Sequence, residues 1–277
     1  MKGIQNPVLK KELKLRFRSF KSFSGLLFYL LTLLIFTGGF FLVATEFKGK
    51  GFITPDINIT FFTMLSYVQL ALVLFITPAL TAGAISTERE KQTLNILLTT
   101  SQTSWQIIFG KLSSSIAYLV LLLFAGLPIS SLVFFFGGVS PGDFLLVYVL
   151  LMIMLIALAS IGIMVSTLIR KTIIAIVTTY GFMLVLTVLT AFFAFISLNF
   201  QDMTSEAVTE TMPFSYIMLA INPFVHLSNV IFPEVSTGIT QLTNIDMSLW
   251  GTYIAFYLII TVVTLSIATR KIRVNMK

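Results

Sequence analysis

Six stretches of the 277-residue chain contain no Asp, Glu, Lys or Arg and are long enough to cross a lipid bilayer. A transmembrane helix needs about 20 apolar residues, at a rise of about 1.5 Å each. Because backbone groups in lipid must find internal partners, such spans are expected to be helices. The expected spans are Ser24–Thr45, Phe61–Ser86, Leu112–Phe136, Phe144–Ile169, Thr172–Ser197 and Leu249–Thr269. The sequence therefore predicts an all-α integral membrane protein with a single transmembrane domain.

The composition excludes several other classes of protein. The chain is 57% hydrophobic and only 10% charged, whereas soluble domains carry about 25% charged residues. It has no Cys and a single His, and its acids lie outside the expected spans. This leaves no nucleophile with a base beside it and no metal-ligand cluster. We therefore expect no catalytic, cofactor-binding or metal-ligating residue, and no enzyme.

The charges divide by side of the membrane. Sixteen of the 18 basic residues lie before the first span, between the second and third spans, between the fourth and fifth spans, or after the last span, all of which are on one side of the membrane. Only Lys48 and Lys50 lie on the opposite side. Acids show the reverse, with only Glu12, Glu88 and Glu90 on the basic side. The positive-inside rule then predicts a multi-pass protein of the cell membrane with both termini cytoplasmic. The net charge of +7 is a topology signal, and no nucleic-acid partner is expected.

The first 23 residues are expected to form a cytoplasmic helix in the membrane interface. Asn6 and Pro7 are suited to the start of a helix that runs from Pro7 to Phe23. One arc of this helix is apolar and the adjoining arc is basic, as in helices that contact lipid phosphates. The apolar arc consists of Leu9, Leu13, Phe17 and Phe20, and the basic arc consists of Lys10, Lys11, Lys14, Arg18 and Lys21. The alternative is a basic topology signal without a defined helix.

The outer connection 198–248 contains an apolar stretch that is not expected to cross the membrane. If Phe214–Phe232 crossed the membrane, the basic C-terminal tail would lie on the outer side, against the positive-inside rule. Pro223 also disfavours helical geometry at Asn222, in the middle of the stretch. We expect two half-helices that enter the outer leaflet and return, with Asn222, Pro223 and His226 at their junction and His226 as a polar interface residue. The connection also holds five acids and no Lys or Arg, which indicates either a solvated face or a surface for a cationic ligand.

The cytoplasmic connection 87–111 combines charged and apolar residues in a helical pattern. Thr87 and Glu90 have the spacing of a capping box, which predicts a short helix from Glu88 to Leu98. Its first turn holds Glu88, Arg89, Glu90 and Lys91, and its apolar face holds Leu94, Leu97 and Leu98. Such a helix can be held by a partner while it packs on its own bundle. The alternative is a loop that only closes a helical hairpin.

The chain lacks a nucleotide-binding motif of its own. Gly110-Lys111 is the nearest approach to a phosphate-binding loop, but Trp105 replaces the first Gly and Leu112 the Ser or Thr. ATP, if used, must be bound by another chain.

Small residues recur at the spacing that allows helices to approach closely. The pairs are Ala79 and Gly83, Gly162 and Ser166, and Ala175 and Thr179. They indicate packing within the bundle or between two copies.

The connection resembles that of the permease subunits of ABC type-2 exporters, which commonly read E-[R/K]-E-x-G-T-L-E-x-L-L-x-T-P and end in G-K. Asn6–Lys14, N-P-V-L-K-K-E-L-K, also resembles the start of many such permeases. Gln92, Asn95 and Ser101 replace the usual Gly, acid and Pro. The residues that fit are Glu88, Arg89, Glu90, Thr93, Leu94, Leu97, Leu98, Thr100, Gly110 and Lys111.

The resemblance implies that separate cytoplasmic ATP-binding cassette ATPase subunits contact the connection and the N-terminal helix. It implies a coupling helix at Glu88–Leu98, with its charged tip nearest the partner and ATP and Mg²⁺ bound on the partner.

These features together predict the permease subunit of an ATP-driven exporter. Two copies, identical or paralogous, are expected to pair around a route for a hydrophobic or amphipathic cargo such as a lipid, peptide or drug. One alternative is a non-transporting scaffold or sensor with the same bundle. Another is an ion-coupled secondary transporter, which the absence of charged residues from the expected spans disfavours.

Overall fold

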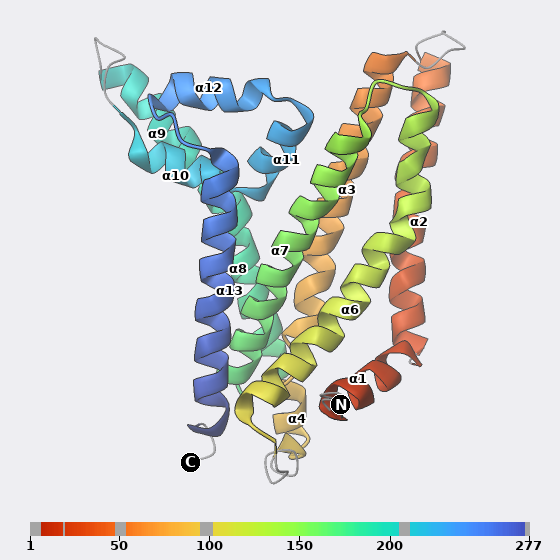
Figure 1. Cartoon of the computed structure of the whole chain (residues 1–277), viewed down its shortest axis with the longest axis vertical. Coiled ribbons are helices and arrows are strands. Elements are labelled where there is room, and N and C mark those ends of the chain that lie inside the picture. The colour runs from red at the N-terminus through yellow and green to blue at the C-terminus, as the bar shows by residue number, and fades with distance from the viewer. Residues whose placement is uncertain (1–6, 19, 48–53, 95–101, 205–210, 275–277) are drawn as a thin grey trace, which may run out of the picture.

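The computed structural model describes residues 7–18, 20–47, 54–94, 102–204 and 211–274, and the regular structure there is entirely helical. Six helical segments within these residues are long and apolar enough to cross a membrane. They run side by side along the long axis of the molecule (Figure 1). The predicted all-α bundle of six spans is confirmed. The segments are α2 (Phe20–Phe47), α3 (Pro55–Thr81), α6 (Ser104–Ser130) with η1 (Ser131–Phe135), α7 (Pro141–Leu168), α8 (Thr172–Leu184) with η2 (Val185–Leu189) and α9 (Thr190–Thr204), and α13 (Leu249–Val274).

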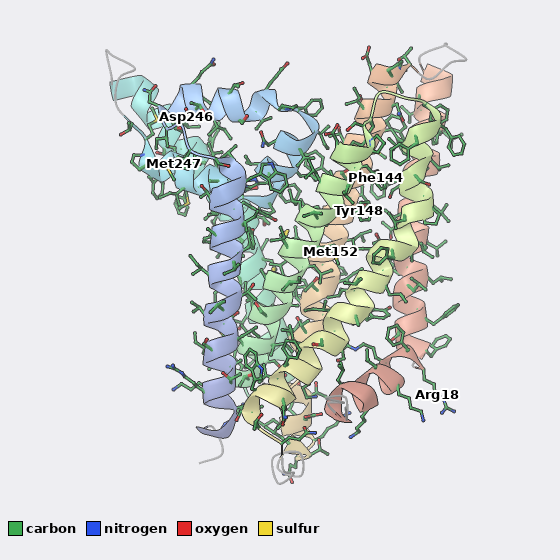
Figure 2. All side chains as sticks on the ribbon, in the orientation of Figure 1. Arg18, Phe144, Tyr148, Met152, Asp246 and Met247 are labelled. Carbon is green, nitrogen blue, oxygen red and sulfur yellow. The ribbon has the colours of Figure 1, made fainter. Side chains whose placement is uncertain are left out.

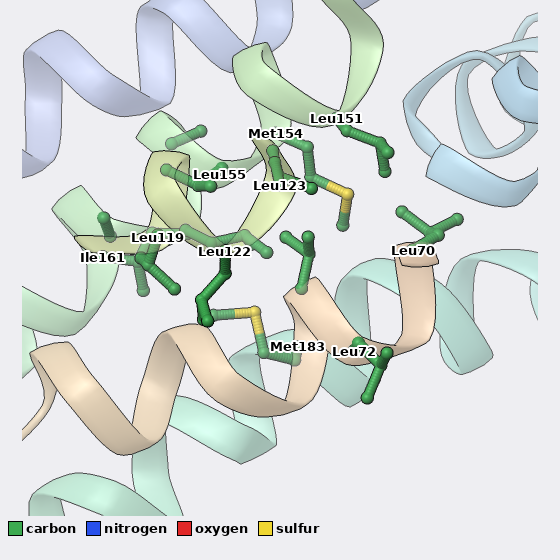
Figure 3. Packing of buried hydrophobic residues seen from close by; sticks show 14 of the residues in the cluster. Leu70, Leu72, Leu119, Leu122, Leu123, Leu151, Met154, Leu155, Ile161 and Met183 are labelled. Carbon is green, nitrogen blue, oxygen red and sulfur yellow. The ribbon is translucent and has the colours of Figure 1, made fainter. Parts of the chain in front are cut away.

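The packing centres on α7. In its most apolar window 56% of the residues of α7 are buried, whereas the corresponding share for α2 is 17%. α7 contacts α3, α6, α8 and α13, and leucine and methionine side chains of α3, α6, α7 and α8 pack together in the core (Figure 3). A helix that is apolar on all sides lies either in a protein core or among lipid chains, and the burial of α7 shows that it lies in the core of the bundle. α7 is therefore the axis against which the other helices are placed.

The two ends of the bundle differ in charge. One end, here called the basic end, is formed by α1 (Pro7–Phe17), α4 (Ser86–Glu90) and the last turns of α13, and the described Lys and Arg residues lie there. The other, the acidic end, is formed by α10 (Pro213–Ile221), α11 (Pro223–Ile231), α12 (Glu234–Thr243) and the first turns of α3 and α7. Asp56, Asp143 and Glu234 lie in first turns there. The separation by sign expected from the sequence is present in the structure.

Several helix ends differ from their predicted positions. The N-terminal helix ends at Phe17 and not at Phe23, because the chain turns at Arg18 and α2 already begins at Phe20. The second span begins at Pro55 and the third at Ser104, both earlier than expected. The absence of charge marks only the hydrocarbon core of about 30 Å, while helices continue through headgroup regions that bring the total to about 40–45 Å.

The half-helices expected near the C-terminus are confirmed as a bent pair. α10 and α11 meet at Asn222 with an angle of 79° between them. α9 ends and α13 begins at the acidic end, and the pair lies between them at that end (Figure 1). The chain thus enters and leaves this segment on the same side, as a re-entrant segment does.

Candidate coupling site at the basic end

Lys111 of α6 forms ion pairs with two other elements at the basic end. Its Nζ atom lies 3.1 Å from Oε1 of Glu12 in α1 and 2.8 Å from Oε1 of Glu88 in α4. The lysine side chain is 4% exposed, and the two carboxylate side chains are 23% and 27% exposed. A buried charge is costly unless it is paired and hydrogen-bonded. These three residues, here called the lysine junction, therefore fix α1 and α4 to α6.

The start of α6 places Lys111 at this position. The Thr103 hydroxyl accepts a hydrogen bond from the backbone N–H of Gln106, and the Gln106 side chain accepts one from the backbone N–H of Thr103. This capping box begins the helix at Ser104. Lys111 then lies about two turns inside the helix. The third span was expected to begin at Leu112, which left Lys111 outside it.

A second contact holds α1 against the same helix. Tyr118 follows Lys111 by about two turns and therefore lies on the same face of α6. Its hydroxyl donates to the carbonyl of Ser22 at 2.5 Å, and its ring packs edge-on against Phe17 with a centroid distance of 6.4 Å. α6 thus contacts α1 at Glu12 and Phe17, and the start of α2 at Ser22.

The neighbours of Glu88 connect α4 to two further helices. The Arg89 guanidinium donates to the carbonyl of Thr167 near the end of α7 at 3.0 Å. The two oxygens of Glu90 accept from the backbone N–H and the hydroxyl of Thr172, at 2.9 and 2.7 Å. Thr172 begins α8, so the carboxylate of Glu90 satisfies an amide that has no partner within that helix. α4 is therefore bonded to α6, α7 and α8.

The predicted helix from Glu88 to Leu98 is not continuous. α4 begins at Ser86 and ends at Glu90, and Gln92 is left-handed with φ at 57°. Thr87 is not the cap: the hydroxyl of Ser166 accepts from the backbone N–H groups of Ile85 and Ser86, which fixes the start of α4 from a neighbouring helix. Leu97 and Leu98 lie outside the described residues.

The eight residues expected to face a partner occupy different environments. Glu88 and Arg89 are partly buried and bonded inward, and Leu94 is buried. Glu90, Lys91 and Thr93 are exposed at the tip of the connection, although Glu90 is also bonded to Thr172. The contact with a partner stays a prediction, for which Lys91 and Thr93 are the best-placed side chains.

Gln92 gives a direct test of the turn after α4. A residue other than Gly in the left-handed region costs about 1 kcal/mol, and the permease pattern has Gly at this position. We expect Gln92→Gly to raise the free energy of unfolding by about 0.5–1 kcal/mol, measured by titrating the micellar protein with SDS. The control is Gln241→Gly, inside exposed α12, where the same exchange should cost about 1 kcal/mol. Equal losses from both variants would contradict the strain at Gln92.

The side chains of α1 and its surroundings differ in exposure. Leu9 and Leu13 are half-buried, and Lys14, Phe17 and Arg18 are exposed. The side chains of Lys10 and Lys21 are outside the described part of the chain, and Phe20 belongs to α2 and is exposed. Contact of this helix with lipid phosphates stays a prediction.

Arg16 was not singled out, yet it holds α1 to a third helix. Its guanidinium donates to the carbonyl of Leu80 in α3 at 3.4 Å. Burial lowers the pKa of the guanidinium from its usual value, and the nearby Glu12 carboxylate opposes that shift. The pKa of an Arg guanidinium is so high that the group keeps its charge. α1 therefore holds a permanent cation against the last turn of α3.

The helices α3 and α7 approach closely near the start of α4. A Cβ atom on Gly162 would lie 2.0 Å from the hydroxyl oxygen of Thr81 and 2.8 Å from its Cβ. One turn further on, Ser166 contacts Ser86. The Gly162–Ser166 spacing therefore marks a packing contact within the bundle, as one of the two sequence interpretations had it.

The junction residues of the re-entrant segment are bonded to the fifth span. Asn222 caps α11 by accepting from the backbone N–H of Phe224 at 2.9 Å. Its amide also donates to the Thr187 carbonyl and the Thr190 hydroxyl, both at 2.8 Å. Thr187 belongs to the π-helix η2. π-helices disturb the regular pattern of helix bonds, and Asn222 adds a donor to the Thr187 carbonyl, which also accepts from the backbone N–H and hydroxyl of Thr190.

His226 is buried within the same segment. Its Nε2 atom lies 2.7 Å from the carbonyl oxygen of Ala220, and its ring centroid lies 4.2 Å from that of Tyr253. Pro223 starts α11. Among the described residues no three His, Asp or Glu side chains are gathered as metal ligands. These contacts assign His226 a place in the packing of α11 against α13.

Sequence reasoning overlooked Glu12 and Lys111 as a pair. Glu12 is the only acid among the first 23 residues, and Lys111 directly precedes an expected span. Each charge sits at a membrane boundary, where charges are common, and Lys111 was noted only as part of a motif, so no ion pair was predicted. An isolated acid in a basic helix, opposite an isolated lysine at a span boundary, is the signal that could have suggested the pair.

The chain was compared with known proteins. A family model described as ABC-2 family transporter protein matches residues 7–271. No curated protein gives a significant match. The matched range extends from α1 into α13 and includes the lysine junction.

Proposed function

The chain belongs to the ABC-2 transporter family, and from that premise we propose that it is the permease subunit of an ATP-driven exporter. In this proposal two copies, identical or paralogous, form the route through the cell membrane. Separate cytoplasmic ATP-binding cassette subunits bind ATP and Mg²⁺ and contact the basic end. Both termini are then cytoplasmic, in agreement with the positive-inside rule.

The lysine junction is the observation that carries this proposal. A force applied at the exposed tip beside Lys91 reaches α6 and α1 through the pairs of Lys111 with Glu88 and Glu12. It reaches α7 and α8 through Arg89 and Glu90. Charge-assisted bonds are short and about twice as strong as neutral ones. A small movement of the connection would therefore move several spans together, as a coupling element must.

The proposed cargo is hydrophobic or amphipathic. The spans are rich in Phe, and Lys111 is the charge that lies deepest in a described spanning helix, near its basic end and neutralised by two acids. A route lined by such helices offers little to a strongly charged solute. Lipids, peptides and drugs fit this chemistry.

The test uses a charge reversal that leaves the junction intact. We expect the tagged chain, purified from its own membranes in mild detergent, to bring with it a subunit that radioactive 8-azido-ATP labels on illumination. Lys91→Glu should reduce the amount of labelled partner that co-purifies severalfold, because reversing the charge at the tip removes its electrostatic complementarity with the partner surface. Lys271→Glu, an exposed lysine at the same end but in α13, should retain it.

Two outcomes would contradict the proposal. Absence of any ATP-labelled subunit from the wild-type preparation would favour a scaffold, a sensor or an ion-coupled transporter. Equal loss of the subunit from both variants would show that general charge, and not the tip, holds the partner.

A further inference from the structure

A groove of about 430 Å³ lies between α6 and α7 in the half of the bundle nearer the acidic end. No polar atom is exposed within it. Phe144, Tyr148 and Met152 mark its course along α7 (Figure 2). Leu145 and Val149 are exposed at its wall, as is Phe124 on the α6 side.

The one hydroxyl-bearing residue of the groove keeps its polar atom inside the protein. The hydroxyl of Tyr148 accepts from Nε2 of Gln69 at 2.9 Å and donates to Oγ of Ser130 at 3.1 Å. Gln69 also donates to Ser130 at 2.8 Å, and the Ser130 hydroxyl donates onward to the Gly126 carbonyl. This network binds α3, α6 and α7 together behind the groove. Only the ring of Tyr148 is left to face an occupant.

The length of the groove matches one leaflet of a membrane. It follows α7 from Phe144, in the first turn, to Ile156. Twelve residues of helix correspond to about 18 Å. Half of a hydrocarbon core of about 30 Å is about 15 Å. The groove thus begins near the headgroup region and ends close to the middle of the membrane.

We infer that this groove binds a single acyl chain of a phospholipid from the leaflet at the acidic end. Lipid chains surround these helices, and a concave apolar surface gives a chain more van der Waals contacts than a flat helix face does. A headgroup or a peptide backbone would find no hydrogen-bond partner there. A helix from a second copy, at about 10–12 Å across, could cover the groove but could not fill it.

The experiment needs neither cargo nor ATPase. The full chain is reconstituted in phosphatidylglycerol–phosphatidylcholine vesicles that contain a phospholipid with a photoreactive diazirine on its acyl chain. After illumination we expect labelled peptides to come mainly from Leu123–Leu127 and Phe144–Ile156. Val149→Trp, which fills the groove, should reduce this labelling about fivefold. The control is Val177→Trp, on the exposed face of α8, which should leave it unchanged.

Three results would overturn the inference. Labelling spread evenly over the exposed faces of α2, α8 and α13 would indicate bulk lipid only. Unchanged labelling in Val149→Trp would place the lipid elsewhere. Disulfide cross-linking between two copies through Val149→Cys would assign the groove to a protein interface. Should Val149→Trp fail to fold, Leu145→Trp at the rim serves in its place. Because binding is measured without transport, failure of this test leaves the proposed exporter function untouched.

Discussion

Lys111→Met is expected to lower the free energy of unfolding by about 3–5 kcal/mol. The substitution keeps the apolar stem of the side chain and removes only the ammonium group, so Glu12 and Glu88 lose their shared cation while they remain largely buried. Removal of one partner from a buried ion pair costs about this amount, because the remaining charge is left uncompensated. Here two carboxylates are left facing each other. The free energy is measured by SDS titration of the micellar protein, followed by tryptophan fluorescence.

Two controls separate the junction from a general effect of charge. Lys91→Met makes the same change at the exposed tip, where the stability should alter by less than about 0.5 kcal/mol. Combining Lys111→Met with Glu12→Gln and Glu88→Gln removes the uncompensated charge and should restore most of the stability, since a whole buried pair can be replaced at little cost. If the triple variant is less stable than Lys111→Met, the junction is not an electrostatic unit.

The sequence predicted the transmembrane layout because the cost of burying charge in lipid is large and local. A stretch such as Phe144–Ile169 can be recognised without any knowledge of its neighbours, and α7 was found at nearly the same residues. The bend at Asn222 was equally local, because Pro223 restricts the residue before it. Effects of this kind depend on a few adjacent residues, so they can be read directly from the chain.

The lysine junction could not be predicted in the same way. Glu12, Glu88 and Lys111 are far apart in the chain, and their meeting depends on how α1 lies across α6. The inward bond of Glu88 to Lys111 could not be predicted for the same reason, since a charge on a short helix can turn outward or onto a neighbour, and contact of Glu88 with a partner stays a prediction. Gln92 also ended the expected helix early, because a residue in the left-handed region interrupts α-helical geometry.

Gly162→Val is expected to destabilise the bundle by about 3 kcal/mol. At this position α7 lies so close to α3 that even a methyl group would overlap Thr81, whose hydroxyl already donates to the Thr77 carbonyl. Turning the Thr81 side chain cannot relieve the contact, because its Cβ atom lies 2.8 Å from the new Cβ. The two helices must therefore separate, which also pulls Ser166 away from the start of α4. The loss is measured by the same SDS titration, and it should be accompanied by faster proteolysis of the connection after α4.

The matched control is Gly181→Val in α8, where nothing beyond the local helix backbone lies within 4 Å of the added Cβ. That variant should alter the stability by less than about 0.5 kcal/mol, because the new side chain faces lipid. Thr81→Gly in the Gly162→Val background removes the atoms that clash and should recover part of the loss. Equal effects of the two valine substitutions would show that β-branching in a helix, and not the contact between α3 and α7, is responsible. A selective loss at Gly162 that Thr81→Gly relieves would establish that this contact sets the distance at which α4 is held beneath the bundle.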